Sequence, residues 1–150
     1  MNTASEEFPT KVEFSRRKKA NEKFILTENI SSEIIQPYRR LNFQARHYHS
    51  DSAVIQKIQA LGGRIQVQAR DVFDLYILFL GGRVQLKNIL AHTTLAERTA
   101  ALEALISLDY ESYLGHVVEY LDFETRKNYE SKKTWNEICN IIAGFLDDSN

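Results

Sequence analysis

The chain has 150 residues, a formal net charge of −1, and a composition that is 43% hydrophobic and 26% charged, with six glycines and two prolines. This length suits one domain with a single hydrophobic core, and the composition excludes collagen-like, low-complexity and largely disordered chains. Because Cys139 is the one cysteine, an intrachain disulfide framework and a cysteine-rich zinc module are also excluded.

The N-terminal third is predicted to be mainly extended. Residues 11–15 alternate polar and apolar side chains, which is the period-two pattern of a half-buried strand. Residues 24–30 and 41–48 are predicted to be the second and third extended segments. Two or three strands are too few for a complete sheet. Either helices cover a small sheet, or another chain supplies the missing strands.

Helical periodicity begins near Ser50. Ser50, Asp51 and Ser52 offer oxygens that can cap a helix, and Gly62 with Gly63 is predicted to end it. Further helices are predicted at about residues 70–80, 95–107, 110–121 and 134–146. Strands followed by helices indicate a single α+β domain over residues 1–150, with strands mainly in 1–49 and helices mainly in 50–150.

The charge is distributed unevenly along the chain. Successive stretches of 50 residues carry net charges of +3, +2 and −6, which suggests that one face meets phosphates or acidic partners. The longest apolar run, residues 75–80, is far shorter than the roughly 20 residues that span a bilayer. The N-terminus has no apolar signal segment. We therefore expect a soluble, cytoplasmic protein without a membrane partner.

The segment KIQALGGRIQVQARDVFDL carries the charged residues of greatest interest. Lys57 and Arg64 are seven residues apart and can converge near the end of a helix. Arg70 and Asp74 have the i,i+4 spacing of a helical ion pair, and Asp71 lies where an acid can cap the first turn. Spacing alone favours the plain interpretation, in which Asp71 is a cap, Arg70 and Asp74 are a surface pair, and Lys57 is solvated.

The pattern K-x-x-A-L-x-x-R followed by R-D-x-x-D-L-Y resembles the AbiEii/AbiGii abortive-infection toxins, a nucleotidyltransferase family with a polymerase-β-like fold. The matching residues are Lys57, Ala60, Leu61, Arg64, Arg70, Asp71, Asp74, Leu75 and Tyr76. The strand VEFSRR and the tail with LDYESYLGHVVEYL and Trp135 are also similar to the family. The resemblance covers nearly the whole chain. It implies a small N-terminal β-sheet remnant of a nucleotidyltransferase fold, followed by a C-terminal helical bundle.

This resemblance implies transfer of a nucleoside monophosphate from a nucleoside triphosphate to an RNA or protein acceptor, with Mg²⁺ held by carboxylates. By position, Glu13 would be a catalytic, metal-binding carboxylate, and Asp74 would be the catalytic acid of the last motif. Lys57, Arg64 and Arg70 would bind the nucleotide. The family also implies a role in a toxin–antitoxin or phage-defence pair, with a cognate antitoxin as partner.

The chain departs from the family in one respect. No Gly-Ser or Gly-Thr followed by D-x-D/E occurs in the sequence, so the first two metal-binding carboxylates are absent, and Glu13 alone cannot hold two metal ions. We expect the isolated chain to be inactive. Three interpretations stay open: a split enzyme completed by a separately encoded N-terminal half, a decayed member of the family, or a non-catalytic interaction module.

Other residues carry weaker indications. His47 and His49 would share one face of a strand, as a metal pair requires, but no further ligand is positioned to complete a site. Cys139 is predicted to be a buried small hydrophobe. The aromatic residues predicted to lie in the core or against a partner, with the core favoured, are Tyr110, Tyr113, Tyr120 and Phe123.

Overall fold

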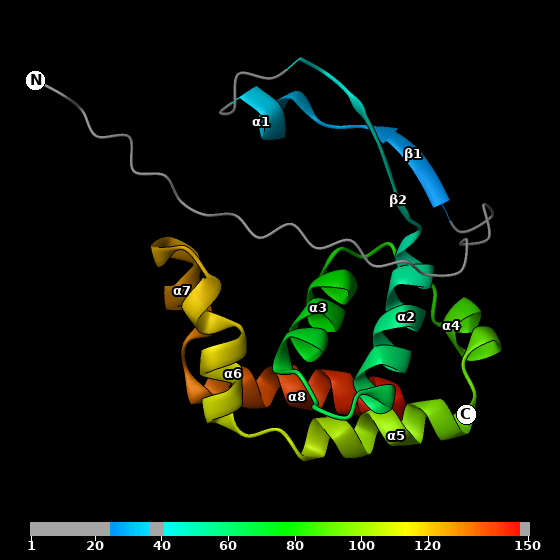
Figure 1. The fold of residues 1–150 in the computed structure, drawn as a ribbon, viewed down its shortest axis with the longest axis vertical. Coiled ribbons are helices and arrows are strands. Elements are labelled where there is room, and N and C mark those ends of the chain that lie inside the picture. Colours follow the sequence, from blue (N-terminus) through cyan, green and yellow to red (C-terminus); the bar gives the residue numbers. More distant parts are fainter. Residues whose placement is uncertain (1–24, 37–40, 148–150) are drawn as a thin grey trace, which may run out of the picture.

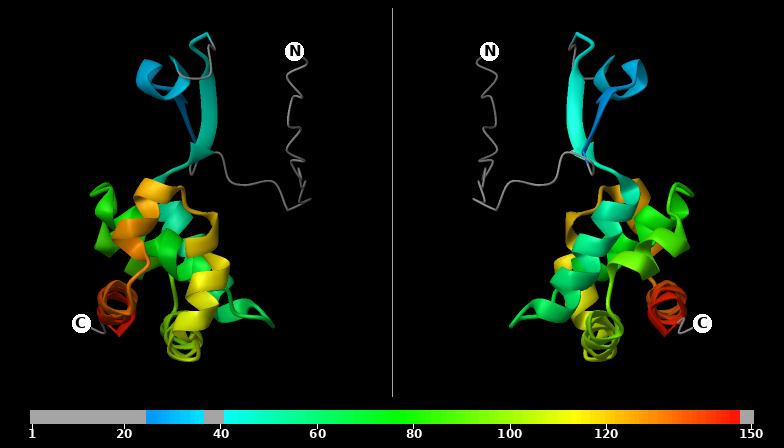
Figure 2. Two further views of the ribbon diagram at one scale, coloured as in Figure 1. Left: turned by 90° about the vertical axis from the view of Figure 1, so that its left-hand side faces the viewer. Right: turned by 90° about the vertical axis from the view of Figure 1, so that its right-hand side faces the viewer.

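A two-stranded hairpin projects from a body of helices in the computed structural model, which describes residues 25–36 and 41–147 (Figures 1 and 2). Strand β1 (Ile25–Asn29) pairs antiparallel with β2 (Gln44–Tyr48), and Ile25 lies opposite Tyr48. The second and third predicted extended segments are thus confirmed, with shorter bounds. The first, residues 11–15, lies outside the described residues. The described chain is mixed α+β and mostly helical, which agrees with the α+β class predicted from the sequence.

The other regular elements of the described chain are helices. Their bounds are α1 (Ser32–Ile35), α2 (Ser50–Gly63), α3 (Ala69–Leu80), α4 (Leu86–His92), α5 (Leu95–Ile106), α6 (Tyr110–His116), the 3₁₀ helix η3 (Val118–Tyr120), α7 (Phe123–Tyr129) and α8 (Lys132–Asp147). None of them is long and apolar enough to cross a bilayer. The long predicted helices are confirmed, while α1, α4 and α7 were not predicted because seven residues or fewer give too little periodicity to recognise.

The predicted helix at 110–121 is wrong in its second half. Helix α6 ends at His116, and Val117 has φ −131° and ψ −64°, which lies outside the helical region. Because the chain changes direction there, a single helical face cannot be continued into η3 and α7. Tyr113 is fully buried as predicted, but Tyr120 and Phe123 are 80% and 71% exposed. For these two residues the prediction of a core position is wrong.

The start of α2 differs from the expected cap. His49 is the N-cap, and its Nδ1 accepts the backbone N–H of Asp51 at 3.3 Å. The buried Asp51 carboxylate instead accepts hydrogen bonds from the Gln85 backbone N–H and the Asn88 side-chain amide, both at 2.8 Å. Asp51 therefore ties α2 to α4 instead of capping its own helix.

The core lies where α2 packs against α3 and α5, and where α8 packs against α3 and α5 (Figure 1). Gly62 allows α2 to approach α5 closely, because a Cβ atom there would lie only 2.9 Å from the Ala101 backbone nitrogen. At the N-terminal end of α8, Trp135 stacks on Tyr113 with ring centroids 4.5 Å apart. The Tyr113 hydroxyl donates a hydrogen bond to the Tyr129 carbonyl oxygen at 3.0 Å, which links α6 to the end of α7.

Candidate functional site

Charged side chains from α2, α3 and the turn between them converge on Asp71, whose carboxylate is fully buried. Its Oδ1 lies 2.9 Å from Lys57 Nζ, and its Oδ2 lies 2.7 Å from Arg64 Nε. The Lys57 ammonium also lies 2.5 Å from Asp74 Oδ2. We call Lys57, Arg64, Asp71 and Asp74 the Asp71 cluster. It contains two cations and two anions, so its formal charge is zero.

The geometry of the two helices explains this convergence. Lys57 and Arg64 are two helical turns apart, so they lie on the same side of α2, with Arg64 as its C-cap residue. Asp71 and Asp74 are one turn apart on α3, which packs against α2. The contact between Arg64 and Asp71 is a short ion pair that lacks the alignment of a hydrogen bond.

Exposure separates the buried anion, Asp71, from the three outer members of the cluster. The side chains of Lys57, Arg64 and Asp74 are 31%, 36% and 45% exposed, while Asp71 is not exposed at all. Removing a carboxylate from water costs several kcal/mol, about as much as a buried ion pair can return. The two cations beside Asp71 offset that cost and are themselves held at the surface.

The environment of Lys57 keeps it charged. Partial burial lowers its pKa, but hydrogen bonds and charges from Asp74 and Asp71 raise the pKa by more, so that it lies above the ordinary lysine value. A raised pKa means that Lys57 is an ammonium throughout the neutral range. It can therefore act as a fixed positive charge but not as a general base near pH 7.

The structure agrees with some of the expected roles and corrects others. Lys57 and Arg64 converge as predicted. The plain interpretation, in which Lys57 is solvated and Asp71 only caps its helix, is wrong, because α3 turns Asp71 inward against α2. Arg70 is exposed, and no ion pair joins it to Asp74 within the described residues, since Asp74 contacts Lys57 instead. Glu13 lies outside the described residues.

Sequence reasoning missed His116. The ring Nδ1 of this residue accepts the backbone N–H of Ala69, the first residue of α3, at 3.3 Å. The two residues are 47 positions apart, and the contact forms because α6 packs against α3. No spacing rule relates such distant residues, so the sequence offered no indication of it.

His47 and His49 do not lie on one strand. His47 lies in β2, and its Nε2 is 3.2 Å from Glu28, whereas His49 has left the strand to cap α2. Within residues 25–36 and 41–147, no three His, Cys, Asp or Glu side chains are grouped as a metal site would require. Cys139 is half-buried, and burial raises the pKa of its thiol to about 11, so that it is protonated near neutral pH.

An open depression lies on α2 beside the cluster. It has a volume of about 390 Å³ and is bordered by Arg64 together with Gln56, Gln59, Ala60 and Gly63. A ligand that contacts Arg64 therefore has room on this side of the helix.

No protein-family model, curated protein or solved structure matches the chain.

Proposed function

We propose that this chain is the C-terminal portion of an AbiEii-type nucleotidyltransferase toxin component, and that its Asp71 cluster binds the triphosphate of a nucleoside triphosphate. The chain alone is inactive. A separately encoded N-terminal half would complete it for transfer of a nucleoside monophosphate to RNA or protein. The observation that carries the proposal is that Lys57 and Arg64, the two cations of the first motif, lie on either side of the buried carboxylate of Asp71, which belongs to the second motif.

The two cations retain hydrogen-bonding capacity for phosphate. An ammonium has three N–H donors, and the contacts of Lys57 within the described residues go to Asp71 and Asp74. The contact of Arg64 in the same part of the chain is made through Nε, which leaves its terminal N–H groups for the bidentate geometry that suits phosphate. Because Asp71 already orders both side chains, less conformational entropy is lost when a phosphate binds.

Asp74 has a different position from Asp71. It is half-exposed and contacts Lys57 from the solvent side, so an incoming triphosphate has to compete with it for the ammonium. In this proposal, Asp74 neutralises Lys57 while the site is free of nucleotide and helps to keep the ammonium protonated. Once phosphate oxygens contact Lys57, the released carboxylate is free to contact the acceptor or the nucleotide.

The two carboxylates of the Asp71 cluster are not placed to form a magnesium site. Mg²⁺ takes carboxylate and water oxygens in octahedral geometry, but both oxygens of Asp71 contact cations, and Oδ2 of Asp74 contacts Lys57. We therefore derive no step through a metal ion from these residues. The proposal assigns magnesium binding to Glu13 and to carboxylates of the completing chain.

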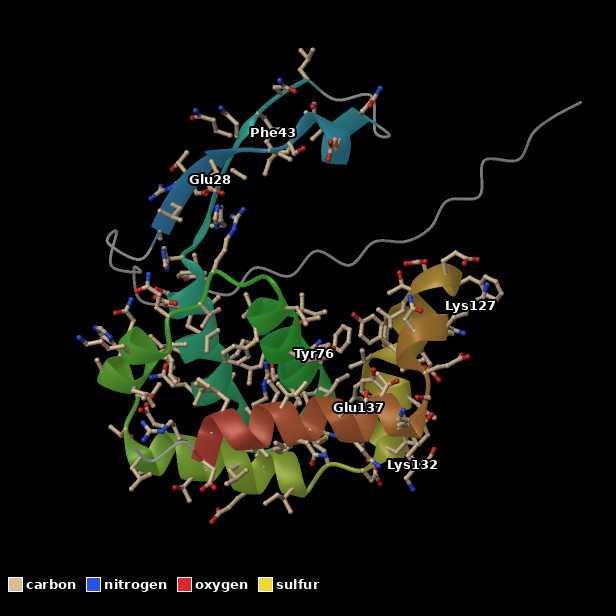
Figure 3. The ribbon with its side chains drawn as sticks, turned by 180° about the vertical axis from the view of Figure 1, so that it is seen from behind. Glu28, Phe43, Tyr76, Lys127, Lys132 and Glu137 are labelled. Atoms are coloured by element: carbon tan, nitrogen blue, oxygen red, sulfur yellow. The ribbon has the colours of Figure 1, made fainter. Side chains whose placement is uncertain are left out.

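The hairpin favours a second candidate, a non-catalytic interaction module. Within the described residues, β1 and β2 have no further strand beside them, and an isolated hairpin is only marginally stable. Leu26 and Phe43 are 37% and 51% exposed on it, and Figure 3 shows Phe43 well away from the helical body. A partner that packs against this face of the hairpin would cover these side chains, whether or not the pair is catalytic.

A calorimetric titration of the folded chain with each ribonucleoside triphosphate and Mg²⁺ tests the proposed function. We expect binding, and we expect Lys57→Ala to weaken it about 10- to 100-fold, because a hydrogen bond to a charged group contributes roughly 1.5–3 kcal/mol. Lys133→Ala is the matched control, since this lysine is 87% exposed on α8. This variant should bind the nucleotide with the affinity of the wild type. Absence of binding to every nucleotide would overturn the proposal and leave the interaction module.

A further inference from the structure

The first turn of α3 has no side-chain cap from its own sequence. The N-cap residue, Gln68, makes no capping hydrogen bond with its side chain, although its carbonyl oxygen accepts the Asp71 N–H at 3.0 Å. The first backbone N–H groups of a helix lack partners within the helix. At α3 the first of them, that of Ala69, is donated to His116 Nδ1.

The imidazole ring is held by a well-packed part of the fold. His116 is half-buried at the last position of α6. That short helix is anchored by Tyr113, which is fully buried and stacks on Trp135. Its N-cap, Asp109, accepts the Ser112 N–H at 2.8 Å. The helix that carries the ring is therefore held in place, and the start of α3 is positioned against the ring Nδ1.

Asp71 lies in the same turn as the capped N–H. It comes two residues after Ala69, and both of its oxygens contact cations at 2.7–2.9 Å. Contacts this short leave little room for a shift of the turn. Any loosening at Ala69 is therefore transmitted to the distances that Asp71 keeps to Lys57 and Arg64.

The cap depends on the protonation state of His116. A backbone N–H can donate only to an unprotonated ring nitrogen, whereas an imidazolium carries protons on both nitrogens. Protonation therefore replaces the acceptor with a donor that faces the N–H of Ala69. It also places a positive charge at the positive end of the α3 dipole.

Charged groups lie on the elements that pack against His116. They are Arg70, Asp71 and Asp74 on α3, Glu119 on η3, Lys132, Lys133, Glu137 and Asp147 on α8, and Asp109 and Glu111 at the start of α6 itself. The pKa of Asp109 is lowered chiefly by hydrogen bonds from Ser112 and slightly by the charge of His116.

We propose that His116 is a positioning residue for the Asp71 cluster: its neutral Nδ1 fixes the first turn of α3, and protonation releases that turn and the contacts of Asp71. The inference concerns the cluster itself and requires no nucleotide. Its test is therefore independent of the test of the proposed function.

Two measurements between pH 8 and pH 5 test this inference. One is the Arg64 Nε–H resonance in ¹H–¹⁵N NMR spectra, and the other is the folded-to-unfolded ratio in urea. His116→Asn keeps an acceptor near the position of Nδ1 but does not titrate, and His116→Leu has no acceptor. His47→Asn, on the exposed hairpin, is the control for the other histidines. For the wild type and the control we expect a shifted Arg64 resonance at pH 5. We also expect their folded-to-unfolded ratio to fall about fivefold more between pH 8 and pH 5 than that of His116→Asn, which is the size of effect that loss of a helix cap has.

His116→Asn should keep the pH 8 resonance down to pH 5, and His116→Leu should show the shifted resonance at both pH values. The proposal is overturned if the wild-type Arg64 resonance does not move, or if His116→Asn titrates as the wild type does. A leucine variant with the wild-type resonance at pH 8 would also overturn it. If the leucine variant does not fold, the comparison of wild type with His116→Asn still decides.

Discussion

Replacing Asp71 with asparagine should lower the free energy of unfolding by about 2–4 kcal/mol, the largest effect we expect from a polar side chain in the described residues. Removal of one partner from a buried ion pair typically costs 3–5 kcal/mol. Here the cost is somewhat smaller, because Lys57 and Arg64 are about one-third exposed and regain some hydration. Urea unfolding at pH 7 measures the effect.

Asp74→Asn is the matched control for this prediction. It removes the same charge from the same helix and also deprives Lys57 of a partner, but the Asp74 side chain is 45% exposed. Because exposed ion pairs contribute little, we expect a loss of less than about 1 kcal/mol. Equal effects of the two substitutions would show that Asp71 is not the centre of the cluster.

Trp135→Ala should be more destabilising still, by about 3–5 kcal/mol, the usual cost of removing a large aromatic side chain from a core. Trp135 is 3% exposed, and its ring lies nearly parallel to that of Tyr113, with an angle of 16° between them. The alanine variant loses this stacking and leaves a cavity between α6 and α8. Chemical denaturation followed by circular dichroism gives the change.

Phe123→Ala serves as the comparison on the surface. Its ring is 71% exposed, and Lys127 lies over it at 4.2 Å, a contact that contributes about 0.5–1 kcal/mol at an exposed site. We expect a loss of no more than about 1 kcal/mol. If Phe123→Ala destabilised the protein as much as Trp135→Ala, the assignment of the core between α6 and α8 would be wrong.

Long, periodic elements could be predicted from the sequence, and short ones could not. Helix α8 repeats apolar residues over four turns, and the glycines at the end of α2 and directly after α3 indicate where these helices end. Helix α4 has seven residues, and it is tied to α2 through the carboxylate of Asp51. That connection arises from tertiary packing, and local periodicity carries no information about it.

The candidate site shows the same division. The spacing of Lys57 and Arg64 predicted that these cations converge, because two helical turns return to the same side of a helix. The burial of Asp71 was not predictable, since it depends on which side of α3 packs against α2. The cap from His116 depends on the packing of a third helix, α6, and could not be predicted from the sequence either.

The central claim is that Lys57 and Arg64, held by Asp71, form a binding site for a triphosphate. Its most direct test is an NMR titration of the isotopically labelled chain with ATP and Mg²⁺, observing the Lys57 side-chain Cε–Hε signals and the Arg64 Nε–H resonance. We predict that these signals shift together and saturate, and that those of Lys132 and Lys133 on α8 stay in place. Saturating shifts confined to other residues, or no shifts at Lys57 and Arg64 at saturating nucleotide, would contradict the account.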